Sequence, residues 1–351
     1  MRCTVLTLLG VAAIGLVSAL AVVGFGLYNV SAAVGHWPGI SWVLHTTYRN
    51  SVELRAPPPS QVPELTDDMA AVGARHYDSA CRFCHSAPQG SRSATARSMV
   101  PAPPPIADAV GHWGPQHLHW IVRNGVKMSG MPHWPAELRE DAVWLVVAFL
   151  DRVRDMSAAE YAKLVARPDD PDAVVAYCAG CHGLDGAGRG NSVMPRLDIL
   201  GEVYIAASLR AYRDGARQSG VMQHAASRLS DEQIVMLARR FAAEPPAVVA
   251  TPPLPDDLVA LGRTLAFGTP DSRDVPACRA CHGPWPTERS ALFPELTGQR
   301  SDYLFTQLTL WHAETRGGTP RAHIMHLVGQ DLDEPQMRAL AAFYAAGAPT
   351  D

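Results

Sequence analysis

The sequence predicts an all-α protein in which three helical lobes follow one apolar N-terminal helix. Three observations support this fold class. The segment Cys3–Tyr28 contains no charged residue, and helix-start signals stand at Thr66, Ser157 and Ser230. A Cys-x-x-Cys-His pentad also occurs three times, with a spacing that suits two thiols on one helical turn. The pentads are CRFCH at Cys81–His85, CAGCH at Cys178–His182 and CRACH at Cys278–His282.

The composition indicates folded domains of modest charge. The chain has 351 residues, which leaves room for two or three domains. Hydrophobic residues make up 47% and the net charge is only -4, so a charged tail or a nucleic-acid-binding protein is excluded. Charged residues account for 18%, while proline and glycine are plentiful. This balance suits small domains with much loop wrapped around large apolar cofactors.

The pentads are the signature of covalent c-type haem attachment. Two thiols form thioethers with the vinyl groups of one haem, and the adjacent histidine supplies the fifth ligand to iron. The alternatives are a zinc half-site or a redox dithiol, but a zinc site needs further cysteines or paired histidines nearby. Three haems c therefore account for six of the seven cysteines. The predicted attachment residues are Cys81, Cys84, Cys178, Cys181, Cys278 and Cys281, and the predicted iron ligands are His85, His182 and His282.

Residues 1–30 are predicted to be an uncleaved transmembrane anchor. A helix from Cys3 to Tyr28 would be about 39 Å long, enough to cross a bilayer. A cleavable signal peptide is the alternative, with small residues at 31–33, but its apolar region would normally be about 7–15 residues. Arg2 favours a cytoplasmic N-terminus. The expected location is the bacterial inner membrane, crossed once, with the haem domains in the periplasm.

Residues 31–65 are predicted to be a juxtamembrane segment and a proline-rich linker. Arg49-Asn50 and the stretch Ala56–Pro63 indicate a stiff spacer, with a loop packed on the first domain as the alternative. Amphipathic aromatic residues that suit the lipid headgroup zone precede it. They are His36, Trp37, Trp42, His45 and Tyr48.

The first haem domain is predicted at residues 66–156. Thr66, followed by two aspartates, begins a helix that ends at Cys81. The stretch Pro101–Pro105 is expected to be extended chain that covers a haem edge. A closing helix at Glu140–Val153 is strongly apolar and should pack across the first helix.

The second haem domain is predicted at residues 157–245. A capping box at Ser157 opens a short connecting helix, and another at Ser230 opens the last helix. Asp170 followed by Pro171 is the predicted start of the helix that carries the second pentad.

The third domain, residues 246–351, follows a proline-rich linker at Glu244–Pro255 and repeats the second domain. At a fixed offset, residues of the two domains coincide until four residues are inserted in the third. The matched pairs include Pro195 and Pro294, Tyr204 and Tyr303, Arg217 and Arg316, and Met222 and Met325.

The sixth iron ligands decide between an electron carrier and an enzyme. In the repeat, Met222 and Met325 are the soft ligands placed equivalently after both pentads. A lone methionine is often core filler, but two at matched positions indicate ligation. Met194 and Met236 are weaker candidates.

For the first haem the choice lies between Met131 and Met128, with Met99 third. Met131 is preferred because Pro132 stiffens the loop that would hold its sulfur over the ring. Histidine ligation is the alternative, from His112, His117, His119 or His133.

Histidine–methionine ligation fills both axial positions, which favours outer-sphere electron transfer and no catalytic residue. An enzyme such as a dihaem peroxidase is the alternative, and it would keep one haem open. Arg217 and Arg316 are expected either to pair with haem propionates or to form a solvated surface pair.

Nearly the whole chain resembles known cytochromes. Residues 66–155 resemble a membrane-anchored class I cytochrome c, on the stretch NGVKMSGMPHW. Residues 170–351 resemble the dihaem cytochrome c4 family, on CAGCHG…MPRL…YIAASLRAYRDGAR…M…LSDEQI and PACRACHG…FPELTGQRSDYLFTQL…RGGT…M.

The resemblance implies three class I cytochrome c domains behind one transmembrane helix, the last two related by a pseudo-twofold axis. It implies the ligand pairs His182 with Met222 and His282 with Met325. The second domain departs from the pattern, because it lacks the Gly-Gln of the third, and an altered loop is expected there. The implied partners are a terminal oxidase, a quinol-oxidising complex or a periplasmic dehydrogenase.

Overall fold

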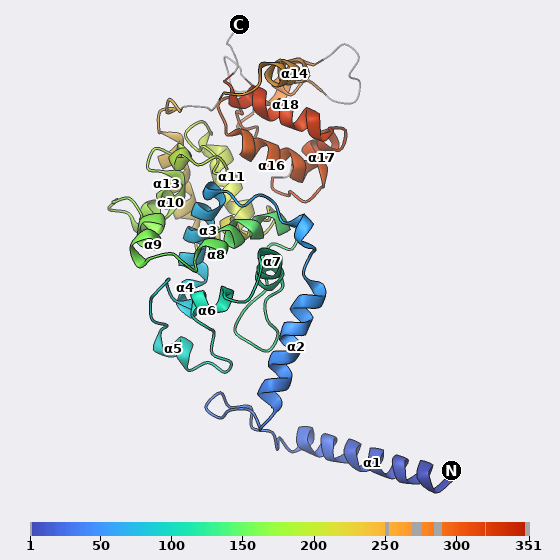
Figure 1. Cartoon of the computed structure of the whole chain (residues 1–351). Coiled ribbons are helices and arrows are strands. Elements are labelled where there is room, and N and C mark those ends of the chain that lie inside the picture. Colours follow the sequence, from blue (N-terminus) through green and yellow to red (C-terminus); the bar gives the residue numbers. More distant parts are fainter. Residues whose placement is uncertain (1, 250–252, 269–275, 284–289, 320, 348–351) are drawn as a thin grey trace.

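The computed structural model describes residues 2–249, 253–268, 276–283, 290–319 and 321–347. Within these ranges the chain is all-helical and contains no strand, as predicted. Figure 1 shows the helices gathered in successive groups, with α1 at one end and α14 and α18 far from it. We call the parts of the chain predicted as domains the first, second and third lobes.

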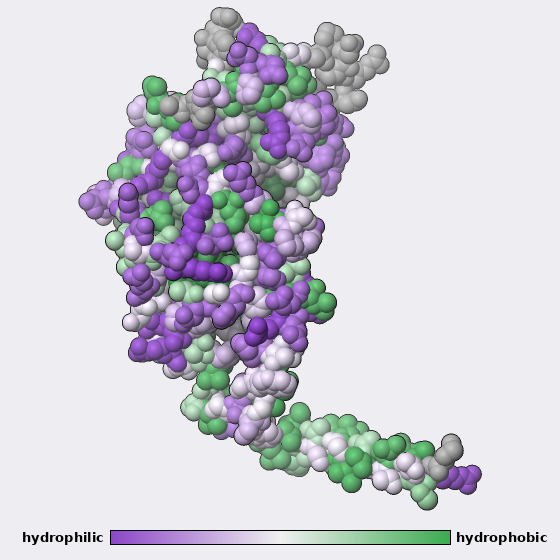
Figure 2. Space-filling model, viewed as in Figure 1, coloured by the Kyte–Doolittle hydropathy of each residue, from purple (hydrophilic) through white to green (hydrophobic). Residues whose placement is uncertain are grey.

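Helix α1, Arg2–Gly24, stands apart from the lobes. It is the one described helix long and apolar enough to cross a bilayer, with a mean hydropathy of 2.5, and a signal sequence near an N-terminus passes the same test. None of its residues is buried against the rest of the chain. Figure 2 shows it as a hydrophobic rod outside the more polar lobes.

Helix α2, Ile40–Arg55, replaces part of the predicted linker. The prediction of a spacer that begins at Arg49 is wrong, because the helix continues through that point and packs on the first lobe. Val52 is fully buried, and the ring of Tyr48 meets Trp113 edge-on at 5.9 Å. Tyr48 and Val52 are one helical turn apart, so they share the face that contacts the lobe. Only the 3₁₀ turn Pro59–Gln61 and its flanks remain as spacer.

The first lobe is built on two crossing helices. As predicted, Thr66 caps α3, since its Oγ1 accepts from the Met69 N–H. Helix α3 crosses α8 at Gly73, where a Cβ would lie 1.9 Å from the Leu145 carbonyl oxygen. The predicted packing of the closing helix across the first is confirmed. The helices are α3 (Asp67–Ala80), α4 (Arg82–His85), α5 (Ala94–Arg97), α6 (Ile106–Val110), α7 (Pro115–Asn124), η2 (Glu140–Ala142) and α8 (Val143–Arg152).

Helix α9, Ala158–Val165, has the predicted capping box at Ser157 but packs with the first lobe. The Tyr161 ring lies 6.0 Å from Phe149, and its hydroxyl donates to Asp78. The predicted boundary at residue 157 assigns this helix to the second domain. Burial of the Tyr161 ring in the first core is the physical reason for the difference.

Helix α10 of the second lobe begins two residues later than predicted. Asp172, not Asp170, caps α10, because its Oδ1 accepts from the amides of Val174 and Val175. The capping box at Ser230 is confirmed. The helices are α10 (Ala173–His182), η3 (Gly188–Gly190), α11 (Glu202–Arg213), α12 (Gly220–Ala226) and α13 (Asp231–Ala242).

The third lobe repeats the crossing of the first. Helix α14 meets α18 at Gly262, where a Cβ would lie 2.0 Å from the Ala339 carbonyl oxygen. Residues 250–252 of the predicted linker, and 348–351 at the end of the predicted domain, lie outside the described residues. The helices are α14 (Asp256–Phe267), α15 (Arg279–His282), α16 (Ser301–His312), α17 (Ala322–Gln330) and α18 (Glu334–Ala345).

Candidate haem sites

The pentad histidines share one contact in all three lobes. Each Nδ1 lies against the carbonyl oxygen of a proline that follows the pentad. A carbonyl only accepts, so Nδ1 carries the proton and Nε2 keeps the lone pair that binds iron. The Nδ1–O distances are 2.9 Å for His85 and Pro104, 3.4 Å for His182 and Pro195, and 3.0 Å for His282 and Pro294.

Burial lowers the pKa of all three histidines, and the proline contact only partly offsets it. The neutral imidazole is the form that binds a metal. In the sequence these prolines stand out only as part of the extended stretch Pro101–Pro105 and as the matched pair Pro195 and Pro294, with no predicted role toward the histidines. The available signal was a proline after every pentad, which follows the histidine by 19, 13 and 12 residues in the three lobes.

The pentad cysteines are half-buried against apolar neighbours. Burial raises the pKa of Cys81 and of Cys178 to about 12, and that of Cys278 to about 11. These three thiols are therefore neutral. Such surroundings suit cysteine sulfur atoms that form thioether bonds to the apolar edge of a haem.

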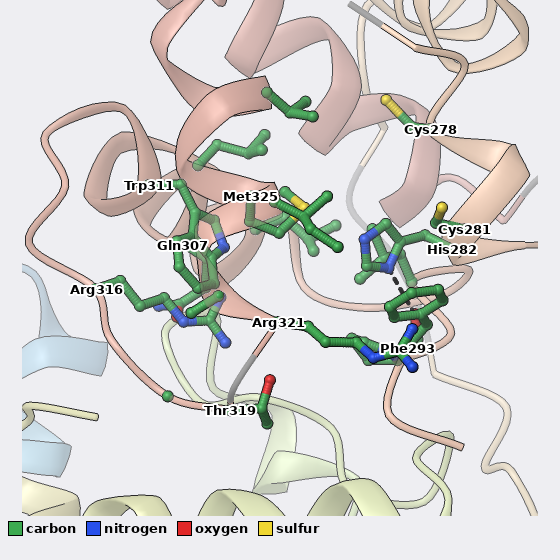
Figure 3. Close-up of a pocket in the computed structure, with 18 of the residues that line it drawn as sticks. Cys278, Cys281, His282, Phe293, Gln307, Trp311, Arg316, Thr319, Arg321 and Met325 are labelled. Atoms are coloured by element: carbon green, nitrogen blue, oxygen red, sulfur yellow. Dashed lines mark hydrogen bonds between the residues drawn. The ribbon is translucent and has the colours of Figure 1, made fainter. Parts of the chain in front are cut away.

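The third lobe shows the arrangement of a haem pocket most fully. Figure 3 shows Cys278, Cys281 and His282 on one side of a cavity and Met325 on the other. Met325 comes from α17 and points into the space that His282 faces. Apolar residues, chiefly leucines and aromatic residues, form most of the remaining wall. The structure thus brings the predicted ligand pair to one apolar cavity.

In the second lobe, Met222 lies in α12, which occupies the place of α17 in the repeat. It is half-buried, and its N–H donates to the capping Ser219 hydroxyl at 3.3 Å. His182 is 7% exposed. The weaker candidates have other surroundings: Met194 is buried near Cys181, and Met236 packs on the core of the second lobe.

In the first lobe the two candidate ligands, Met128 and Met131, differ in burial. Met128 is 83% exposed, whereas Met131 is half-buried against the first core. The Val126 N–H donates to the Met131 carbonyl at 3.1 Å, and the Met131 N–H donates to Ser129 Oγ. These bonds close the loop and hold Met131 inward. Met131 stays the predicted ligand.

Three of the alternative histidines are engaged elsewhere. His119 stacks on Trp144 at 4.1 Å, and its Nε2 faces the Glu140 carbonyl. His117 pairs with Glu53 of α2, and Nδ1 of His133 faces the Trp134 carbonyl. These contacts favour methionine as the ligand of the first haem.

Arg217 and Arg316 are 5% and 8% exposed, so the solvated-surface interpretation is wrong. Each reaches the phenol of the other lobe at 3.2 Å, Arg217 to Tyr303 and Arg316 to Tyr204. Each guanidinium also lies over an aromatic ring of its own lobe. Burial alone would raise the pKa of Tyr204, but the two cations outweigh it and lower that pKa to about 8.

These two cations fit a haem that carries carboxylates. In the described part of the chain, no ion pair joins either guanidinium to a carboxylate. The Nε of Arg316 is buried and lacks a hydrogen-bond partner. Arg316 also lines the cavity of the third lobe. A haem c seated there would supply propionates to cations that otherwise stay uncompensated.

An all-helical fold with Cys-x-x-Cys-His pentads and oriented histidines defines a c-type cytochrome. Residues 68–150 match the family model described as cytochrome c oxidase, cbb3-type, subunit III. Two proteins named thiosulfate dehydrogenase electron acceptor are similar. That of Stutzerimonas stutzeri is 32% identical over 61% of this chain and 94% of its own length. That of Thiomonas intermedia is 35% identical over 49% of this chain and 78% of its own.

Cytochrome c4 of Pseudomonas aeruginosa is 31% identical over 49% of this chain and 84% of its own length. The chain belongs to this family of c-type cytochromes and contains a c4-like module. It binds haem c covalently and is an electron-transfer cytochrome.

Proposed function

We propose that the chain is a membrane-anchored trihaem cytochrome that passes single electrons on the periplasmic side of the inner membrane. The observation that carries the proposal is the proline carbonyl against Nδ1 of the histidine in every pentad. This contact recurs in the first lobe and in both lobes of the repeat. It supports three haems, bound through the pentad cysteines and histidines.

The proposed sixth ligands are Met131, Met222 and Met325. The cavity of the third lobe supports this set, because Met325 faces His282 across an apolar space. A methionine there blocks small molecules from the iron, which supports a carrier over a peroxidase-like enzyme. The reaction is then a one-electron change at each iron, with no bond formed to a substrate.

Helix α1 is the proposed anchor. Its exposed apolar surface has no partner among the described residues, which lipid would supply. Helix α2 begins 16 positions after α1 ends and packs on the first lobe. The first lobe is therefore the one held near the membrane.

The proposed donor is a periplasmic dehydrogenase that oxidises thiosulfate. The names of two relatives, thiosulfate dehydrogenase electron acceptor, support this choice. The proposed acceptor is a terminal oxidase, in keeping with the oxidase-subunit model that matches the first lobe. A quinol-oxidising complex is the alternative donor.

The test uses the full chain purified in detergent. Pyridine-haemochrome analysis should give three haems c per chain, and the variant Cys278→Ala/Cys281→Ala should give two. The oxidised chain is then mixed with a thiosulfate dehydrogenase, with and without thiosulfate. Rapid haem reduction that requires both is the expected result. Fewer than three haems would refute the trihaem assignment, and no reduction would refute the donor.

A further inference from the structure

The segment Ala216–Met222 of the second lobe touches both neighbouring lobes. On one side it meets the third lobe. A Cβ at Gly317 would lie 1.8 Å from the Ala216 carbonyl oxygen, and Arg217 donates to Tyr303. The segment ends at Met222, the proposed sixth ligand of the second haem. The segment that leads to the proposed ligand of the second iron is thus part of the contact between two lobes.

On its other side the same segment meets the first lobe. Gln218 accepts twice there: its Oε1 from the Leu138 N–H at 2.8 Å, and its carbonyl from Arg139 at 3.0 Å. Val221 adds its side chain to the core of the first lobe. The contact therefore combines hydrogen bonds with apolar packing.

Trp134 lies at the centre of this contact. The Trp134 side chain is buried, at 5% exposed, and its backbone N–H donates to the Arg123 carbonyl at 2.9 Å. A Cβ at Gly220 would lie 2.0 Å from the Cε2 and Cζ2 of its indole. The ring therefore rests directly on the backbone of the second lobe, at a position where only glycine leaves room. Its Nε1 has no hydrogen-bond partner, so packing alone holds the ring there.

Two histidines complete the same contact. The His76 ring of α3 meets Trp134 edge-on at 5.2 Å and meets His224 of α12 at 5.4 Å. The indole is thus enclosed by rings and backbone, which leaves no water layer between the lobes at this point.

Trp134 and Gly220 are both close in sequence to proposed sixth ligands. Trp134 follows Met131 by three residues, and Gly220 precedes Met222 by two. The indole therefore lies where the loop that holds Met131 meets the start of α12, the helix that holds Met222. Close-packed atoms transmit an electron more effectively than a water-filled gap, and an aromatic ring fills the space with the largest rigid group available.

We propose that Trp134 is the bridge through which the first and second haems exchange electrons. The relay order is then first, second, third, with Ala216–Met222 as its junction. In each step one electron leaves a reduced haem iron and reduces the next oxidised iron, without a proton or a bond change. This inference rests on the proposed trihaem carrier and adds its internal route.

The test is electron redistribution within the oxidised full chain. A ruthenium photoreductant delivers less than one electron per chain in a laser flash, and haem absorbance is followed. Redistribution between haems appears as a phase whose rate does not depend on protein concentration. Trp134→Leu should slow this phase severalfold, and Trp134→Phe should slow it less because an aromatic ring remains. Midpoint potentials and the haem count should stay unchanged in both.

Two variants serve as matched controls. Trp144→Leu removes a tryptophan that packs on the core of the same lobe and stacks on His119, and it should leave the redistribution rate unchanged. Gln218→Ala weakens the same contact without touching the indole and should slow the phase less than Trp134→Leu.

The outcomes separate this inference from the proposed function. An unchanged redistribution rate in a fully loaded Trp134→Leu variant would overturn the bridge while three haems remain. Equal slowing in Gln218→Ala would also overturn it, because lobe contact in general would then be the cause. Absence of any redistribution phase in the parent chain would instead refute the trihaem relay itself.

Discussion

The Arg217 guanidinium of the second lobe lies 3.2 Å from the Tyr303 hydroxyl of the third. The reverse contact, from Arg316 to Tyr204, has the same length. The two lobes are sequence repeats, so one interaction is made twice across their contact. It buries two cations beside a haem cavity, where their charges act through a medium that screens weakly.

Replacing Arg217 by methionine should lower the reduction potential of the third haem. Arg217 lines the cavity of that lobe, and a nearby positive charge favours the reduced iron. A loss of about 1.4 kcal/mol corresponds to about 59 mV for one electron, so we expect a fall of tens of millivolts. Spectroelectrochemical titration of the full chain measures it.

Two further variants make this prediction specific. Arg217→Lys keeps the charge but loses the forked contacts, so the potential should stay near that of the parent. Arg239→Met removes an exposed cation that pairs with Glu202 on the surface of the second lobe, and it should change little. A shift in Arg217→Lys as large as in Arg217→Met would show that geometry, not charge, sets the potential.

Substitution of Met131, but not of Met128, should remove one of three contributions to the far-red methionine–iron band of the oxidised protein. Met131 is held inward by two hydrogen bonds of its backbone, one with the Val126 N–H and one with the Ser129 hydroxyl, whereas Met128 is exposed. Met131→His should also lower the potential of one haem, because imidazole replaces the thioether. Met128→Leu is the matched control. Band loss in Met128→Leu instead would reassign the ligand.

Removal of the Asp198 carboxylate should destabilise the protein by about 3–5 kcal/mol, as expected when a buried pair loses one partner. The Asp198 side chain is fully buried, and its two oxygens accept from Arg196 at 3.0 and 2.6 Å. Asp198→Asn keeps the shape and removes the charge. Denaturant unfolding of the haem-loaded chain provides the measurement.

The control for this pair is the exposed ion pair of Glu334 and Arg338. Glu334→Gln should cost about 0–1 kcal/mol, because water already solvates both partners. If Asp198→Asn were equally mild, the buried pair would contribute no more than a surface one.

Acid should destabilise the protein partly through His76. Burial, and then the neighbouring His224, lower the pKa of His76 to about 3, whereas the pKa of a histidine in the unfolded chain is near the ordinary value of 6.5. Between these values the unfolded chain binds a proton that the native one does not. Stability therefore falls as pH drops below 6.5, by up to about 1.4 kcal/mol per pH unit.

The variant His76→Phe should lose this contribution, and its stability should fall less between pH 7 and pH 4.5 than that of the parent. Unfolding at several pH values tests the difference. His112→Phe replaces an exposed histidine and should keep the parent's slope. Parallel slopes for parent and His76→Phe would exclude His76 as a source of the acid sensitivity.

Local signals in the sequence were sufficient for most of the fold. The caps at Thr66, Ser157 and Ser230 form hydrogen bonds between residues a few positions apart, so the sequence predicts them directly. The start of α10 was misplaced by two residues, because Asp170 and Asp172 are both good caps. Helix α2 was missed because Tyr48 and Val52 gain their stability from contact with the first lobe, which no local pattern encodes.

The sequence by itself determined the chemistry of this protein. The pentads, the matched methionines and the repeat are patterns of residue type and spacing along the chain, so they can be recognised without coordinates. The tertiary structure decided how the lobes meet, since those contacts join residues far apart in the chain. Arg217 meets Tyr303 across the contact between the second and third lobes, and Trp134 touches the second lobe where Gly220 leaves space. Close packing between distant residues requires the folded arrangement of all three lobes, which periodicity and spacing do not contain.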